Sequence, residues 1–319
     1  MDTLYSMLTL ALIFSTPIII AGLGGLFSER SGIVNIALEG LMMFGAFAGA
    51  AATVLLEPVF AGGPNLAPWF GLTIGLLTGA TVSILHAYLS INLNADQVIS
   101  GTGINLFAVG ATVYMSEIIF GQQRTEAFNK GFIKTTVPGL SKIPIIGEVF
   151  FSNIYVTVYI AIALVFLTWF VVYKTRFGLR LRSTGENPHA ADSMGISVKK
   201  MRYIGVILSG ALAGLAGAVM VLTQDTQYTV GSIHGTGFIA LAALIFGRWK
   251  PFGVLMAGFF FGFSQILSFY INDIPLISGL PFEFFNAFPY AVTIVALVVF
   301  SSKSVGPKAA GEPYDKGKR

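Results

Sequence analysis

Residues 203–224 read YIGVILSGALAGLAGAVMVLTQ and contain no charged side chain. A helix of this length crosses the hydrocarbon core of a bilayer, which needs about 20 mostly apolar residues. Gly210, Gly214 and Ala218 recur at four-residue spacing, which indicates close packing of one helix face against a neighbouring helix. We therefore expect a packed transmembrane helix here.

The same apolar character recurs along most of the chain. The weakest stretch is 226–247, where three glycines interrupt the pattern, and we expect a broken or re-entrant short helix there. The other stretches long enough to span a bilayer are 4–25, 33–56, 66–91, 97–116, 149–173, 251–272 and 284–302. The predicted fold class is all-α, a polytopic membrane helical bundle of about nine transmembrane helices.

The composition excludes other classes of protein. Hydrophobic residues make up 55% of the 319 positions and charged residues only 11%, against roughly 25% in soluble domains. A soluble globule and a disordered chain are therefore both excluded. Cysteine is absent, so the chain has neither a disulfide framework nor a thiolate metal site.

The positions of the basic residues predict an orientation. Fifteen of the 19 fall in four places: Arg30, the loop 174–202, the pair Arg248 and Lys250, and the tail 303–319. With nine spans, all four places lie in the cytoplasm, as the positive-inside rule requires. The N-terminus then lies outside and the C-terminus inside. We expect one transmembrane domain, residues 1–302, and a disordered cytoplasmic tail, residues 303–319.

The motifs of several enzyme classes are absent. The sequence has no G-x-x-x-x-G-K-[ST] loop for ATP phosphates, no H-E-x-x-H metal motif and no G-x-S-x-G nucleophile elbow. We therefore expect no catalytic residue and no metal site. Transport or anchoring explains the chain better than catalysis.

The basic loop 174–202 has the signals of a short helix. Asn187 is a fitting N-cap, Pro188 suits the first helical position, and Gly195 suits a helix stop. Ala190, Ala191 and Met194 would give the helix a small apolar face. The loop is either an ordinary positive-inside connection or a docking site for a cytoplasmic protein, and the residues alone leave both open.

Residues 178–196, GLRLRSTGENPHAADSMGI, resemble the coupling-helix loop of permease subunits in bacterial ABC importers of the ribose and branched-chain amino acid type. Residues 28–40, SERSGIVNIALEG, and 96–106, DQVISGTGINL, are similar to the nucleoside or simple-sugar permease subgroup. With the spans, the resemblance covers about residues 4–302.

This resemblance implies a complex in the bacterial plasma membrane. Its parts are a second permease subunit, related but different, an ABC ATPase subunit, and an extracellular substrate-binding lipoprotein. ATP and magnesium are bound by the ATPase, so this chain needs no cofactor, and no nucleic acid partner is implied. The substrate is a nucleoside, or alternatively a ribose-like sugar or a branched-chain amino acid. A stand-alone secondary transporter is the remaining alternative.

The resemblance also implies that one set of residues couples the permease to the ATPase: Arg182, Ser183, Gly185, Asn187, Pro188, Ala190, Ala191, Met194, Gly195 and Ile196. Alternating access then moves the substrate, driven by the separate ATPase.

Polar groups inside the membrane are costly and are therefore functional candidates. Six of them are candidates for the substrate pathway: Asn35, Glu39, Asn105, Asp225, Tyr228 and His234. For Glu39, pairing with a neighbouring helix is favoured over a place in the pathway. Asn105 fits an interhelical hydrogen bond as well as a ligand contact. Glu29 and Arg30 fit either a cytoplasmic interface pair or the end of a broken helix.

Overall fold

The computed structural model describes residues 2–144, 146–270, 287, 291 and 306–315. Within these ranges the secondary structure is helical, apart from one isolated β-bridge between Thr135 and Ile154. The all-α prediction is therefore confirmed. The predicted span 284–302 lies almost wholly outside the described residues.

Six of the described helices are long and apolar enough to cross a membrane, and each overlaps a predicted span. They are α1 (Asp2–Arg30), α2 (Leu38–Leu56), α3 (Ala67–Ile91), α4 (Gln97–Phe120), α6 (Val156–Lys174) and α9 (Val198–Gln224). Two shorter apolar helices, α10 (Thr236–Phe246) and α11 (Pro251–Phe269), follow α9. The remaining elements are η1 (Leu140–Lys142), α5 (Ile146–Phe151), α7 (Arg176–Glu186), α8 (Pro188–Ser193) and η2 (Val230–Ser232).

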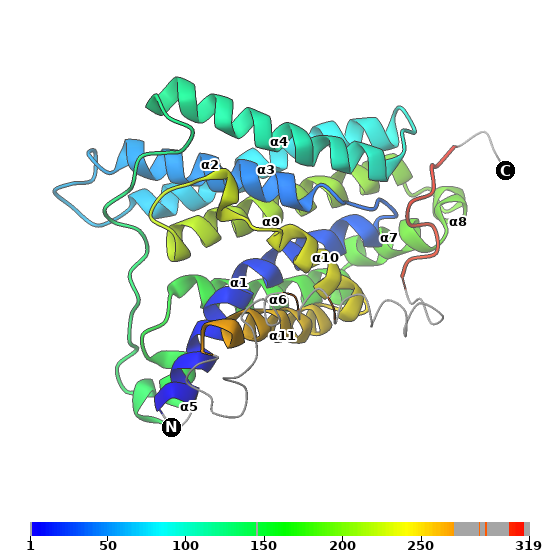
Figure 1. Cartoon of the computed structure of the whole chain (residues 1–319). Helices are drawn as coiled ribbons and strands as arrows, with labels where there is room; N and C mark the ends of the chain where they lie inside the picture. Colours follow the sequence, from blue (N-terminus) through cyan, green and yellow to red (C-terminus); the bar gives the residue numbers. More distant parts are fainter. Residues whose placement is uncertain (1, 145, 271–286, 288–290, 292–305, 316–319) are drawn as a thin grey trace.

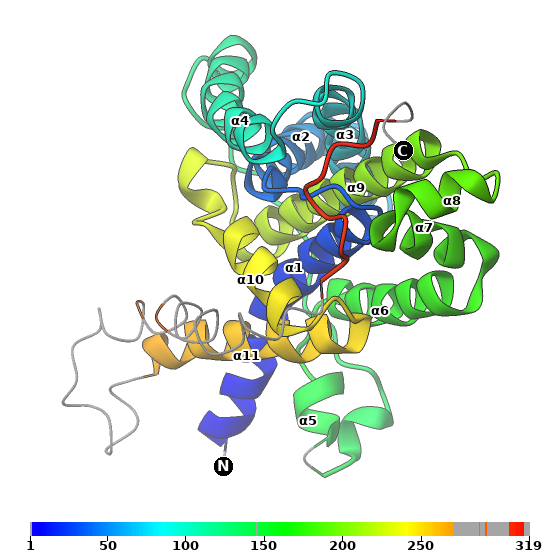
Figure 2. The ribbon, with the colours of Figure 1, turned by 90° about the vertical axis from the view of Figure 1, so that its right-hand side faces the viewer.

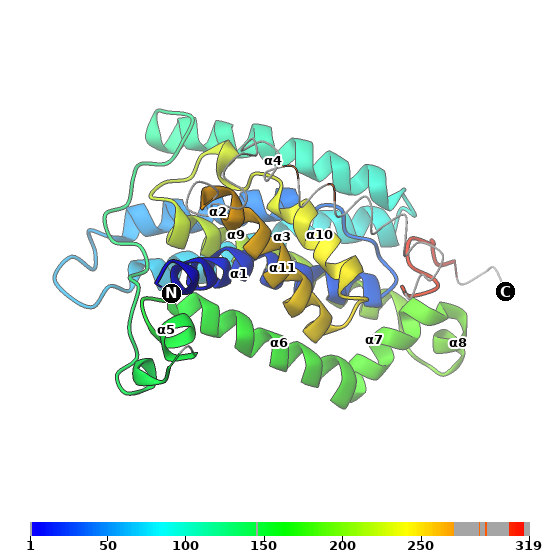
Figure 3. The ribbon, with the colours of Figure 1, turned by 60° about the horizontal axis from the view of Figure 1, so that its bottom comes forward.

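Helix α9 packs against α1, α2 and α3 in the core of the bundle. Its small residues allow backbones to approach closely, as predicted for the four-residue spacing. A Cβ added at Gly79 of α3 would lie 2.2 Å from the carbonyl oxygen of Gly210, and one at Gly45 of α2 would lie 2.2 Å from that of Gly214. Figure 3 shows α4 and α6 on opposite sides of the bundle, with α1, α10 and α11 between them.

The connections gather at two opposite ends of the bundle (Figure 1). One end carries the loop 57–66, the long connection 121–155 and α5. The other carries α7, α8, the turn 247–250 and residues 306–315. The described basic residues outside 121–150 lie at this second end, which we call the basic end.

Residues 306–315 correct one prediction. We expected a disordered tail because the segment is polar and rich in glycine and proline. Instead Ala309 and Tyr314 are buried, and the amides of Ala309 and Gly311 donate to the carbonyl oxygens of Gly185 and Gly32. These partners are distant in sequence, so a prediction from local composition misses them.

Candidate functional site

Two irregular segments lie inside the helical bundle. Residues 31–37 return from the end of α1 into the interior before α2 begins, and residues 225–235 lead from α9 to the start of α10. Ile33, Asn35 and Ala37 are fully buried. At such depth each backbone polar group needs a partner in the protein or water.

Two asparagines supply partners for the first segment. The Asn35 side-chain amide donates to Ser209 Oγ of α9 at 2.8 Å, and its oxygen accepts from the amide of Ala37 at 3.1 Å. The Asn105 amide donates to the carbonyl of Ile36 at 3.0 Å, and its oxygen accepts from the amide of Gly40 at 2.8 Å. Both side chains therefore hold the start of α2 in place.

Glu39 joins the two irregular segments. Its carboxylate accepts hydrogen bonds from the amides of Gly235 at 2.9 Å and Gly237 at 2.7 Å, at the N-terminus of α10. The first amides of a helix have no partner within it and carry a partial positive charge, so a carboxylate is stabilised there. The favoured pairing of Glu39 with another helix is the arrangement that the structure shows.

The N-termini of α2 and α10 meet at this point. A Cβ on Gly237 would lie 2.5 Å from Glu39 Cα, so only glycine allows the two backbones to approach this closely. Gly235 has φ +79, which glycine adopts without strain. We call Asn35, Glu39, Asn105 and the start of α10 the junction.

The other three pathway candidates lie along 225–235. Tyr228 is fully buried, and its hydroxyl donates to Thr112 Oγ1 of α4 at 2.9 Å. Asp225 follows the end of α9 as its C-cap and is half-buried. His234 is exposed and has φ +50.

The structure brings some of these candidates together. His234 directly precedes Gly235, whose amide binds the Glu39 carboxylate, so His234 lies beside the junction. Phe238, on the first turn of α10, is also exposed. Tyr228 instead belongs to the core, where its ring packs edge-on against Phe47.

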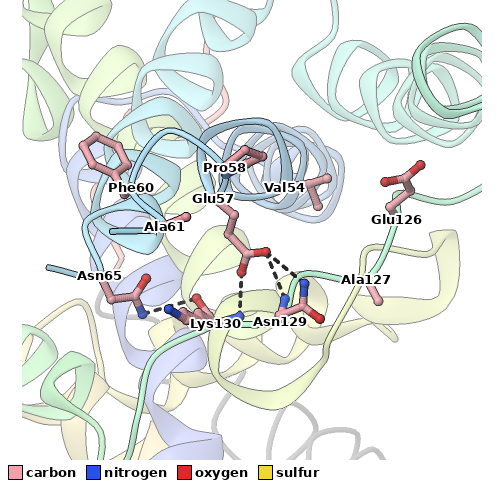
Figure 4. Close-up of a pocket in the computed structure, with 10 residues that line it drawn as sticks. All are labelled: Val54, Glu57, Pro58, Phe60, Ala61, Asn65, Glu126, Ala127, Asn129 and Lys130. Carbon is pink, nitrogen blue, oxygen red and sulfur yellow. Dashed lines mark hydrogen bonds between the residues drawn. The ribbon is translucent and has the colours of Figure 1, made fainter. Parts of the chain in front are cut away.

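A cavity of about 350 Å³, drawn in Figure 4, lies between the loop 57–66 and the connection 121–155, which Figure 1 shows at the end opposite the basic end. The Glu57 carboxylate lies between its walls and accepts hydrogen bonds from the amides of Asn129 and Lys130. Asn65 donates to the carbonyl of Gly131. The sequence did not indicate this cavity, because its walls come from two loops that are far apart in the chain. Glu57 and Lys130, which are joined by a hydrogen bond across it, are 73 residues apart.

The predicted short helix at the basic end is α8. Asn187 is its N-cap and accepts from the amide of Ala190 at 3.0 Å, and Pro188 takes the first turn. Gly195 ends the turn after it, with φ +79. The helix α7 that precedes it was not predicted. Its N-cap is Thr175, whose hydroxyl accepts from the amide of Gly178.

The residues predicted to couple the chain to an ATPase fall into three groups by exposure. Exposed residues are Asn187, Ala190, Met194 and Gly195, and Met194 is 82% exposed. Buried residues are Gly185, Pro188 and Ala191, and partly buried residues are Arg182, Ser183 and Ile196. A Cβ on Gly185 would lie 2.4 Å from the carbonyl oxygen of Arg30, so α7 contacts the end of α1 directly.

Trp249 is a functional candidate that the sequence interpretation missed. Its indole Nε1 donates to the buried carboxylate of Glu29, and its carbonyl accepts from Arg30 Nη2 at 2.9 Å. Arg30 Nη1 also lies 3.8 Å from Glu186 at the end of α7. The sequence identifies Glu29 and Arg30 as polar groups at the end of a span. It contains no local signal for their contact with Trp249, which is 220 residues away from Glu29.

Helix N-termini that meet inside a membrane bundle are a feature of transporters. The fold and the junction together therefore define a multi-pass membrane transport protein.

The comparisons specify the family. The chain belongs to the family described as the permease component of branched-chain amino acid transport systems, which it matches over residues 7–297. It is 48% identical to the guanosine ABC transporter permease protein NupQ of Bacillus subtilis, over 97% of this chain and 96% of that one. No solved structure is a significant match.

Two further relatives extend the comparison. The nucleoside ABC transporter permease protein NupC of Lactococcus lactis is 42% identical over 99% of both chains. The glucose ABC transporter permease protein TsgB13 of Haloferax volcanii is 26% identical over 80% of this chain and 67% of that one. The chain is thus a permease subunit of an ABC importer and not an enzyme.

Proposed function

We propose that this chain is one of the permease subunits through which an ABC importer moves nucleosides, guanosine among them, into the cell. The observation that carries the substrate class is the 48% identity, over nearly the whole chain, with a permease named for guanosine. The 42% identity with a second permease, named for nucleosides, supports the same class.

The proposed complex contains a second permease, an ATPase that binds ATP and magnesium, and an extracellular binding lipoprotein, in the plasma membrane. Helix α8 suits ATPase docking because it is short, has an exposed face and is flanked in the sequence by Arg180, Arg182, Lys199 and Lys200. The basic end then faces the cytoplasm.

The proposed role of the junction is to control the pathway. The start of α10 is held to α2 by Glu39, and α10 ends at the turn that contains Trp249, beside α1 and α7. A movement at the basic end therefore reaches the junction through one short helix. His234 and Phe238 are the exposed groups next to it, and an imidazole and an aromatic ring suit a ribose hydroxyl and a base.

The test is uptake of radiolabelled guanosine by proteoliposomes that contain the chain, its partner permease and the ATPase, supplied with the binding protein. We expect guanosine uptake to require ATP on the side of the membrane where the ATPase lies. Unlabelled adenosine should suppress this uptake, whereas glucose and leucine should not. Uptake driven by an ion gradient without the ATPase would contradict the proposal. Suppression by glucose alone would assign the chain to the class of the Haloferax relative.

A further inference from the structure

The segment 306–315, which we call the strap, crosses the basic end of the bundle. Figure 2, which looks onto this end, shows it running across α9 and α1 beside α7 and α8. The amide of Ala309 donates to the Gly185 carbonyl at 2.9 Å, and the amide of Gly311 donates to the Gly32 carbonyl at 3.2 Å. The strap thus joins the end of α7 to the turn that follows α1.

Arg202, in the first turns of α9, depends on the strap. Only 1% of this residue is exposed. Its Nη1 donates to the carbonyl of Glu312 at 3.1 Å, and its guanidinium lies 5.9 Å from the ring centre of Tyr314. Burying a cation is costly unless other groups compensate it. The strap supplies one hydrogen bond and one ring contact toward this compensation, while Nε and Nη2 of Arg202 have no hydrogen-bond partner among the described residues.

Tyr314 packs against the inner face of α8. Its ring centre is 5.2 Å from that of His189, and Tyr314 forms an apolar cluster with Ala191, Val198 and Ile196. The outer face of α8, with Ala190 and Met194, stays exposed. A helix of six residues is not stable by itself and needs such packing.

The strap also reaches the turn between α10 and α11. A Cβ on Gly306 would lie 3.1 Å from the indole of Trp249, and Pro307 lies next to Gly185. Trp249 is the residue that binds Glu29 and Arg30. One segment therefore contacts α8 and the parts of the chain that lead to the junction.

We propose that the strap is a positioning element of the coupling apparatus, which clamps α8 to α9 and to the end of α1. A force that the ATPase applies to α8 then moves the membrane helices, whereas without the clamp α8 tilts alone. This inference rests on the proposed function, because it needs an ATPase that acts on α8.

The first test measures the clamp without an ATPase. Hydrogen exchange of the full chain in nanodiscs is followed by mass spectrometry for wild type and for Tyr314→Ala. We expect the amides of residues 189–196 to exchange about tenfold faster in Tyr314→Ala, since an aromatic contact is lost from a marginal helix. Tyr314→Phe keeps the ring, so its exchange should stay much slower than that of Tyr314→Ala. Lys308→Ala, an exposed position in the same strap, is the matched control.

Unchanged exchange of residues 189–196 in Tyr314→Ala overturns the inference, whatever the transport assay shows. Exchange of α2 and α3 in the same experiment shows whether the variant is folded. If Tyr314→Ala does not fold, Tyr314→Leu takes its place; it loses the ring contacts but keeps part of the apolar packing, so we expect a smaller increase in exchange in the same direction.

The second test measures coupling in the complete complex. We expect Tyr314→Ala to co-purify with the ATPase and to hydrolyse ATP, but to take up several-fold less guanosine per ATP than Lys308→Ala. An unchanged ratio of uptake to hydrolysis overturns the role of the strap. If the wild-type complex shows no ATP-dependent uptake, the proposed function fails instead, so the two failures are distinguishable.

Discussion

At the scale of single residues, the polar groups inside the bundle have mainly structural partners. Asn35 and Asn105 each use both their amide and their carbonyl on backbone or side-chain groups around the start of α2. His86 and Gln97 similarly bind the backbone of Val34. Polarity in the membrane therefore identifies these residues as candidates, but their partners decide what they do.

Glu39→Gln tests the bonds at the junction. Glutamine has one acceptor oxygen and one NH₂ group, so either Gly235 or Gly237 would face a donor. We expect a loss of stability of about 1–3 kcal/mol and weaker guanosine uptake, because a buried N–H is left unpaired. Thermal unfolding in detergent measures the first effect. The control is Glu117→Gln, an exposed acid on α4, and an equal loss in the two variants would contradict the role of Glu39.

Gly237→Ala tests the close approach of the two backbones. The new Cβ would lie 2.5 Å from Glu39 Cα, so α2 and α10 must separate. We expect destabilisation of about 1–3 kcal/mol, the usual cost of overpacking. At Gly103 of α4 an added Cβ meets nothing within 4 Å, so Gly103→Ala should be neutral or stabilising by roughly 0.5–1 kcal/mol. Similar melting temperatures for both variants would count against the junction.

At the scale of elements, apolar length predicted the existence of the described spanning helices, and local capping signals predicted α8. Where helices begin inside the membrane was not predictable. The stretch 33–56 was predicted as one span, yet α2 begins at Leu38, where Asn105 of α4 satisfies the backbone on both sides of that point. Such a partner leaves no signal in the local pattern.

The contact between α1 and the α10–α11 turn carries a prediction at this scale. Trp249→Phe removes the indole donor that binds the buried Glu29 carboxylate but keeps the carbonyl that accepts from Arg30. We expect a loss of about 1–3 kcal/mol in the free energy of unfolding. Adding Glu29→Gln to Trp249→Phe should recover part of this lost free energy, since a neutral amide without a partner is less costly to bury than a carboxylate without one.

A double-mutant cycle measures this contact. The Trp249→Phe and Glu29→Gln pair should show a coupling energy of about 0.5–3 kcal/mol, as residues in direct contact do. Trp69→Phe, at a more exposed tryptophan near the opposite end, provides the reference substitution. Additive effects of Trp249→Phe and Glu29→Gln would mean that the indole bond does not join α1 to the turn.

At the scale of the whole molecule, the position of charge was more informative than its sum. The net charge of +4 indicates no particular partner, but the grouping of basic residues predicted which connections lie at one end of the bundle. The tail was predicted less well. Its composition is that of a disordered segment, but the strap has partners distant in the sequence, Arg202, Gly185 and Gly32 among them.

The absence of cysteine makes the predicted orientation directly testable, because an introduced thiol is the sole labelling site. Ser193→Cys on α8 and Lys130→Cys in the 121–155 connection are both exposed and lie at opposite ends. A membrane-impermeant maleimide should label Lys130→Cys in intact cells and Ser193→Cys only in inverted vesicles, since the basic end faces the cytoplasm. The reverse pattern would invert the orientation and place α8 beyond the reach of a cytoplasmic ATPase. Labelling of both thiols from one side would contradict the two-ended arrangement of the bundle itself.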